Sequence, residues 1–195
     1  MAASCIYFIT TMSYSRGRSF DRPDFDFQEG TMTNRRKRNS DEELRTLIQS
    51  YEMEDDFTHA HVTDQMIRNA EMELGVHLPA TYVHFLKNYG QGGFTLFAVL
   101  GFRQDGTPVF VDATEDYRKF YQLPHSYVVV EENDDGNYCI NTANGRVCLW
   151  RAGWEKGVSR YRDFKTYFRT RILDTVTDPD FELARRAANP IRNYS

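Results

Sequence analysis

Apolar residues recur every three to four positions in three stretches of the first half of the chain, a spacing typical of helices with one buried face. A capping-box pattern from Ser40 to Glu43 opens the first stretch. Gly75 ends the second stretch, and Leu78-Pro79 separates it from the third, which stops at Gly90. The apolar positions of the three predicted helices are Leu44, Leu47, Ile48 and Tyr51, then Met66, Ile67, Ala70 and Leu74, then Tyr82, Phe85, Leu86 and Tyr89.

Strand patterns follow the glycines at positions 92 and 93. A hairpin is predicted from strands at Phe94–Phe102 and Thr107–Val111, with a turn at Gln104-Asp105-Gly106 between them. A three-stranded meander is predicted next, over residues 126–131, 137–142 and 146–150. Asp-Gly and Asn-Gly pairs supply the positive φ angles that its two tight turns need.

Helical spacing returns near the C-terminus. It predicts a helix that covers one face of the sheet, followed by a short helix over residues 178–188. The apolar positions of the longer helix are Tyr161, Phe164, Phe168 and Ile172. Because helices and strands are segregated along the chain, we expect an α+β fold, an antiparallel-rich mixed sheet flanked by helices.

The N-terminal part carries no such periodicity. Residues 13–26 mix polar, charged and aromatic side chains, and residues 34–38 are a basic run. We expect a poorly ordered tail over residues 1–39, a single domain over 40–175, and a C-terminal helix with a loose tail over 176–195. Met32 stands directly before the basic run and is a candidate for the true initiator.

The predicted helical hairpin and the segments after it carry an ordered set of apolar, aromatic, acidic and glycine positions. They are Ile67, Glu71, Leu74, Gly75, Leu78-Pro79, Tyr82, Phe85-Leu86, Tyr89-Gly90 and Gly92-Gly93, then Glu115, Leu123-Pro124, Tyr127-Val128 and Asp135-Gly136. The set resembles the signature of the SUKH superfamily over roughly residues 63–173. The residues before it have no counterpart in that signature.

The resemblance implies a non-catalytic α+β binding module that needs no cofactor. The superfamily includes bacterial toxin-immunity proteins and a fungal regulator of cell-wall synthesis. The partner that it implies first is therefore a cognate protein toxin. A regulatory scaffold of the cell-wall or signalling type is the alternative.

The composition of the chain predicts where in the cell the protein is located. No apolar run is long enough to cross a bilayer, and the apolar start of the chain has neither a preceding basic residue nor a small-residue cleavage site. Cys5, Cys139 and Cys148 are an odd number of cysteines without metal-type spacing, which predicts reduced thiols. A disulfide between Cys139 and Cys148 is the less favoured alternative. We expect a soluble, cytoplasmic protein.

Charge is divided unevenly along the chain. Residues 41–150 carry 18 acidic and seven basic side chains, a net charge of −11, between ends of +3 and +4. An acidic surface attracts a basic partner such as a nuclease and repels nucleic acid. The alternative is that the charge only aids solubility. Nucleic-acid binding through Arg35–Arg38 and Arg160–Arg171 is the competing interpretation, but the aromatics of the second segment are better explained as the buried face of a helix.

The sequence contains little indication of a metal site, a phosphate site or a catalytic site. His59 and His61 lie near acidic residues, but spacing determines no third metal ligand. The acidic run 131–136 lacks the alternating ligands and closing glutamate of a calcium loop, which favours a hairpin turn. Gln91-Gly92-Gly93 follows a helix, so it cannot cradle a phosphate as a P-loop does. We therefore expect no catalytic and no metal site.

Two acidic segments and several aromatics are the candidate partner-binding residues. The acids would steer and dock a basic partner. The aromatics would anchor it wherever they are exposed, since aromatics dominate interface hot spots, and core packing is the alternative for each. The candidate acids are Glu52, Glu54, Asp55, Asp56, Glu131, Glu132, Asp134 and Asp135, and the candidate aromatics are Tyr89, Phe94, Tyr121, Trp150 and Trp154.

Overall fold

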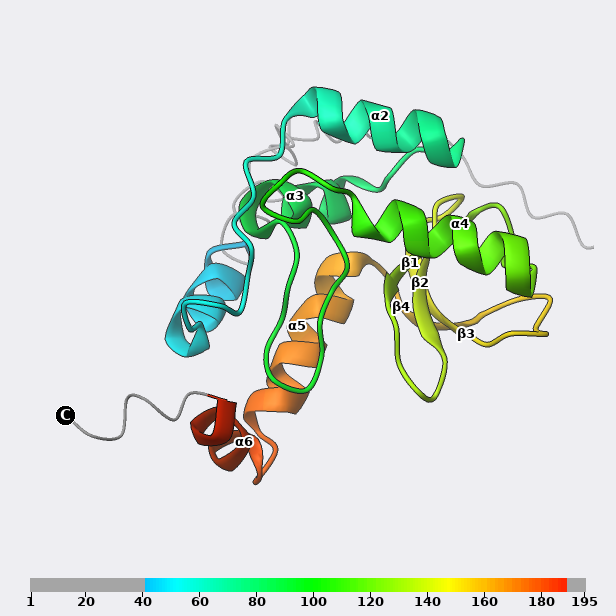
Figure 1. Ribbon diagram of the computed structural model, residues 1–195. Coiled ribbons are helices and arrows are strands. Elements are labelled where there is room, and N and C mark those ends of the chain that lie inside the picture. Colours follow the sequence, from blue (N-terminus) through cyan, green and yellow to red (C-terminus); the bar gives the residue numbers. More distant parts are fainter. Residues whose placement is uncertain (1–40, 189–195) are drawn as a thin grey trace, which may run out of the picture. The chain divides into compact units, whose positions relative to one another are not determined.

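The computed structural model describes residues 41–188, which belong to one compact unit beginning at Ser40. This part contains six helices and a four-stranded antiparallel sheet (Figure 1), so the predicted α+β class is confirmed. None of its helices is both long and apolar enough to cross a bilayer. The expectations about Met32, the basic run Arg35–Arg38 and the two chain ends lie outside the described residues.

The three helices predicted in the first half are present, within about two residues of their expected ends. A helix over residues 41–51 is followed by α2 (Asp64–Leu74) and α3 (Ala80–Tyr89). The Thr63 hydroxyl accepts a hydrogen bond from the Met66 N–H and begins α2. Gly75 ends it in the left-handed region, with φ 67°, as its position predicts.

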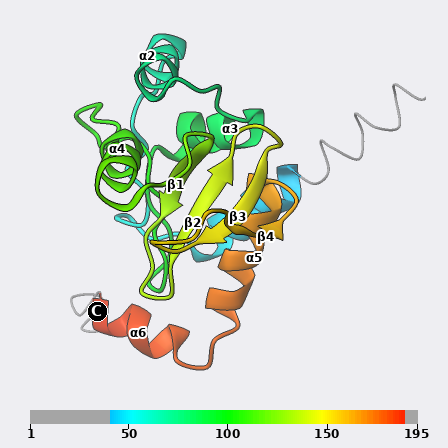
Figure 2. The ribbon, with the colours of Figure 1, turned by 90° about the vertical axis from the view of Figure 1, so that its right-hand side faces the viewer.

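The predicted meander is also present and forms most of the sheet. Its strands are β1 (Tyr127–Glu131), β2 (Asn137–Asn141) and β3 (Arg146–Trp150), and β4 (Val158–Tyr161) adds a short edge strand that the sequence analysis missed. The strands follow one another in the order β1-β2-β3-β4, all antiparallel (Figure 2).

Both faces of this sheet are covered, which is why every residue of β1 is buried. One face carries Val128, Val130, Ile140 and Val147 into the main core with α3 and α5 (Phe164–Val176). The other face carries Tyr127, Val129, Cys139 and Trp150, which pack with Leu123 and with Tyr117 of α4 (Val109–Tyr121). Figure 2 shows α4 beside β1 and α5 beside β4.

The predicted hairpin over residues 94–111 is wrong. Residues 94–102 form no strand beyond isolated bridges, and α4 begins at Val109, directly after Pro108. The β-branched residues Val109 and Val111 favour a strand locally. Packing decides otherwise, because α4 buries its apolar face against β1 and α2. The signal for this helix is the spacing of Phe110, Val111, Thr114, Tyr117 and Tyr121.

The C-terminal helices are close to their predicted places. α5 begins at Phe164, capped by the Asp163 carboxylate, which accepts from the Thr166 N–H at 2.7 Å. The prediction that Tyr161 belongs to this helix is wrong, because Tyr161 lies on β4. α6 (Phe181–Ala188) follows, and Phe181 packs edge-on against Tyr51 of the helix over residues 41–51.

The two described cysteines offer a direct test of this core. Cys139 and Cys148 face each other across β2 and β3 as buried free thiols, and burial raises the pKa of both. Because the thiolate is the reactive form, we expect neither thiol to react with a thiol-specific dye in the folded chain at neutral pH, and both to react in urea. A Cys5→Ala variant restricts the assay to these two residues. Equal labelling rates with and without urea would contradict this packing.

Candidate functional site

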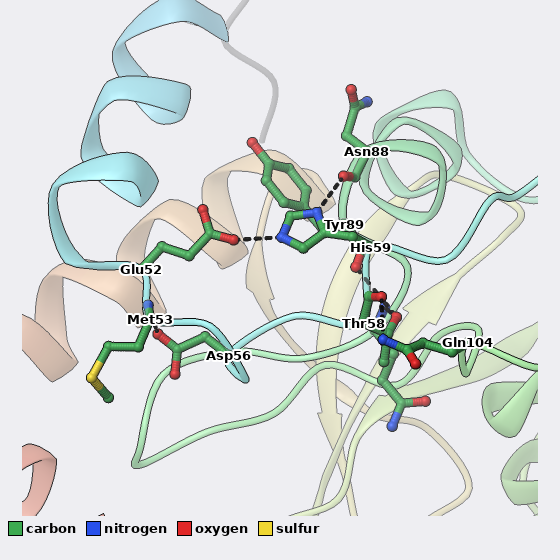
Figure 3. A network of polar contacts seen from close by, with 9 residues as sticks. Glu52, Met53, Asp56, Thr58, His59, Asn88, Tyr89 and Gln104 are labelled. Carbon is green, nitrogen blue, oxygen red and sulfur yellow. Dashed lines mark hydrogen bonds and ion pairs between the residues drawn. The ribbon is translucent and has the colours of Figure 1, made fainter. Parts of the chain in front are cut away.

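An acidic turn follows the helix over residues 41–51. The Met53 N–H donates to the Asp56 carboxylate at 2.7 Å, and the Asp56 N–H donates back to the Met53 carbonyl at 3.2 Å (Figure 3). Glu54 and Asp55 lie between these two bonds with exposed side chains. The acidic turn, residues 53–56, therefore holds the predicted site residues Glu54, Asp55 and Asp56 close together at the surface.

A glycine-rich segment runs beside this turn. The Thr58 N–H donates to the Gln91 carbonyl, and the Gly93 N–H donates to the Asp56 carbonyl, both at 2.9 Å. Gly92 also exchanges two backbone hydrogen bonds with Val99, so residues 93–98 form a loop. The acidic turn and this loop are the walls of a surface groove of about 700 Å³, which we call the acidic groove.

The lining of the acidic groove combines carboxylates and apolar side chains with the neutral polar side chains of Thr58, Gln91, Thr95 and Gln104. Its charged side chains are all carboxylates, those of Glu54, Asp55 and Asp56. Phe94 and Phe97 are buried beneath the opposite wall, whereas Leu96 on that wall is 51% exposed. The groove thus combines negative charge on one side with an accessible apolar side chain on the other.

Polar contacts attach the acidic turn to α3 (Figure 3). The His59 imidazole lies 2.6 Å from the Glu52 carboxylate through Nε2 and 3.3 Å from the Asn88 carbonyl through Nδ1. The Thr58 hydroxyl donates to the Phe102 carbonyl at 2.8 Å, and Gln104 donates to the Thr58 carbonyl at 3.4 Å. The contacts of His59 with Glu52 and Asn88 connect the acidic turn to α3, so Glu52 and His59 have a structural role.

The titration of Asp56 reflects its place at the groove. Burial raises the pKa of the Asp56 carboxyl, and the neighbouring carboxylates of Glu52 and Asp55 raise it further. The hydrogen bond from Met53 and the charge of Arg185 act in the opposite direction. A partly desolvated carboxylate of this kind is stabilised by any cation that approaches it.

The prediction that Glu131 belongs to an exposed acidic hairpin is wrong, because its side chain is buried. A bulge between Val129 and Glu131 shifts the register of β1. Glu131 is thereby paired with Tyr138 and turned toward α5. Its carboxylate pairs with the Arg171 guanidinium at 2.6 Å and accepts a hydrogen bond from the Tyr167 hydroxyl. Glu131 therefore stabilises the core and is closed to a partner.

The other acids of the β1–β2 turn remain at the surface. Glu132, Asp134 and Asp135 are exposed, and the Asn133 side chain accepts from the Asp135 N–H to shape the turn. Glu132 accepts a hydrogen bond from the Tyr117 hydroxyl of α4 at 3.1 Å. The turn thus lies against the C-terminal half of α4, a neighbour that the sequence analysis did not predict.

The candidate aromatics divide into exposed and buried ones. Tyr121 and Trp154 are 50% and 36% exposed, whereas Phe94 and Trp150 belong to the core and Tyr89 is half-buried. Trp150 donates its ring N–H to the Trp154 carbonyl, and Arg151 stacks over the Trp154 ring at 5.5 Å while pairing with Asp135. We call the exposed set the hairpin surface, which consists of Tyr121, Glu132, Asp134, Asp135 and Trp154.

Metal ligation finds no support in the histidines. His59 and His61 are exposed, and no group of three histidine, cysteine or carboxylate side chains within residues 41–188 is arranged to hold a metal ion. The aromatics of the arginine-rich segment behave as its buried-face interpretation predicts, since Phe164, Tyr167 and Phe168 lie in the core.

A comparison with protein families decides the affiliation of this fold. The family model SUKH_5, described as SMI1-KNR4 cell-wall, matches residues 42–173, more than half of the chain. The chain belongs to the SMI1-KNR4 family of the SUKH superfamily. The SUKH domain begins in the helix over residues 41–51 and ends in α5, so it contains both the acidic groove and the hairpin surface.

The signature residues of this SUKH domain hold the fold together. Tyr82 is buried between α3 and α5, and the Glu71 carboxylate accepts from the Leu78 N–H at the connection between α2 and α3. Gly92 and Gly93 allow the groove walls to approach, because an added Cβ would lie 2.0 Å from the Asp56 carbonyl oxygen or 2.2 Å from that of Phe97. Asp55, Glu132 and Asp134 lie outside these signature positions, and their side chains are exposed.

Proposed function

We propose that this SUKH protein is a non-catalytic, cytoplasmic immunity protein that neutralises a cognate toxin with a basic surface, such as a nuclease, by binding it directly. The hairpin surface is the observation that carries the proposal. It combines exposed carboxylates, which steer an oppositely charged protein, with two exposed aromatics, which bury apolar area on contact. The net charge of −11 over residues 41–150 acts in the same direction.

The titratable groups support a binding role over catalysis. Among the described residues, the pKa values of Tyr82, Tyr167 and Cys139 are raised most strongly, in each case first by burial. All three side chains lie in the core, where no substrate reaches them. A catalytic site usually places its most strongly perturbed groups in an accessible cleft. The acidic groove holds Asp56, whose pKa is raised, but the described residues of its lining include no histidine, cysteine or lysine that could act together with it.

Co-purification followed by a toxicity assay tests this function. The tagged full chain is purified from its native cells at moderate salt, and a stoichiometric partner is then expressed alone and together with the chain. Immunity predicts that the partner arrests growth alone and that co-expression restores growth. Growth that is unaffected by the partner in both cases would contradict the proposal.

A regulatory scaffold is the second candidate, favoured by the cell-wall description of the matching family. The same surfaces would then recruit several regulatory proteins in turn. Many substoichiometric partners in the purification, none of them toxic, would favour the scaffold over immunity.

Charge reversal on the hairpin surface has a specific expected effect on binding. In a Glu132→Lys, Asp134→Lys, Asp135→Lys variant, the association rate with the purified partner should fall about tenfold or more at low salt, because electrostatic steering is lost. The association rate of this variant should also depend less on salt concentration than that of the unchanged chain. Stopped-flow measurement over a salt series checks both.

A second triple variant controls for net charge alone. It carries Glu43→Lys, Glu73→Lys and Asp174→Lys, all exposed acids on other helices, and changes the total charge by the same amount. An equal slowing in both variants would show that the hairpin surface has no special part in docking.

A further inference from the structure

We infer that the acidic groove receives an extended basic segment of a protein partner, with a lysine or arginine side chain against Asp55 and Asp56 and an apolar side chain against Leu96. The inference rests on the proposed binding function and adds a second contact region to the hairpin surface.

The groove has the size of a binding site. Its volume of about 700 Å³ lies within the ~300–1,000 Å³ typical of pockets that hold ligands. Hydrogen bonds fix both of its walls, between Met53 and Asp56 on one side and between Gly92 and Val99 on the other. A pre-formed site loses less conformational entropy when it binds.

The charge of the groove selects a cation. All charged side chains in its lining are carboxylates, and burial already disfavours the ionised form of Asp56, whose pKa is raised. A lysine or arginine beside Asp56 would reverse this shift and gain from the pairing. Within the described residues, the charge of Arg185 on α6 acts on Asp56, but Arg185 is not part of the groove lining.

A protein cation fits the groove better than a metal ion. Within the described chain, no three carboxylate, histidine or cysteine side chains are gathered in the way that metal coordination requires. Leu96, half of whose surface is exposed, gives the opposite wall an apolar contact. A segment that presents a basic and an apolar side chain close together satisfies both walls, and nucleic acid is repelled by the same carboxylates.

The apolar wall is supported from behind by the core. Phe97 lines the groove, and the Arg171 guanidinium stacks on its ring at 5.1 Å. Arg171 is held in turn by the buried Glu131. The ion pair that removes Glu131 from the surface therefore fixes one wall of the groove.

A labelled peptide in which lysine and leucine alternate is the probe for this inference. Fluorescence anisotropy with the full chain should show saturable binding, which an Asp55→Lys variant weakens about tenfold or more. Loss of the apolar contact in a Leu96→Ser variant should weaken binding about fivefold. Glu73→Lys is the matched control, since it reverses an exposed acid on α2, outside both the acidic groove and the hairpin surface, and it should leave the affinity unchanged within about twofold.

Two further peptides test the chemistry of the occupant. Replacing lysine by glutamate should abolish binding, and replacing leucine by serine should weaken it as Leu96→Ser does. Binding that is absent, that survives Asp55→Lys, or that falls equally with Glu73→Lys would overturn the groove as the site. A chain that suppresses toxicity but fails this peptide test would retain the proposed function and lose only the groove.

Discussion

Replacing Glu131 by alanine is expected to lower the free energy of unfolding by about 3–5 kcal/mol, the typical cost of leaving one member of a buried ion pair without its partner. The Glu131 carboxylate is 2% exposed and receives the Arg171 guanidinium through two hydrogen bonds, at 2.6 and 3.2 Å, together with the Tyr167 hydroxyl. Without it, the charge of Arg171 and the hydroxyl of Tyr167 remain in a largely apolar environment. This loss is a large part of the ~5–15 kcal/mol that usually stabilises a domain.

Urea denaturation followed by circular dichroism measures this change. The matched control is Asp134→Ala, which removes an exposed carboxylate from the same turn and should cost less than about 0.5 kcal/mol. Replacing both partners, in Glu131→Leu with Arg171→Met, should recover part of the loss because no buried charge then remains unpaired. A Glu131→Ala variant as stable as the control would show that the ion pair does not stabilise the fold.

Replacing Gly92 by alanine is expected to cost about 2–6 kcal/mol, because overpacking and backbone strain each contribute about 1–3 kcal/mol there. The added Cβ would lie 2.0 Å from the Asp56 carbonyl oxygen and 2.9 Å from the Phe57 Cα. The backbone at Gly92 also has φ 132°, which an alanine rarely adopts. The walls of the acidic groove would separate, and peptide binding should be lost together with stability.

Gly153→Ala separates these two causes. Gly153 also has a positive φ, of 83°, but an added Cβ would meet no atom within 4 Å. This variant should cost only the ~1–2 kcal/mol of a left-handed backbone. The two variants are compared by their loss in free energy of unfolding in urea. The difference measures the cost of overpacking where Gly92 approaches the Asp56 carbonyl. Equal losses would mean that backbone conformation alone requires glycine at position 92.

Local patterns were sufficient for most of the secondary structure. The helix over residues 41–51, α2, α3 and the β1–β2–β3 meander were predicted because each depends on signals within about a dozen residues, such as the left-handed stop at Gly75. The signals around Val109 and Val111 were misleading. Their preference for strands is weaker than the burial of Phe110 against Tyr82 and Phe102 and of Thr114 against β1, and that burial is tertiary.

The α+β class, the SUKH signature and the positions of the acidic and aromatic residues follow from the sequence. Which of these side chains are accessible at the surface depends on how the chain folds. A bulge and a residue 40 positions away bury Glu131, whereas the adjacent Glu132 remains exposed. The acidic turn became a groove wall only through its pairing with residues 91–93. The physical reason is that exposure and proximity depend on contacts between distant segments, which local periodicity does not encode.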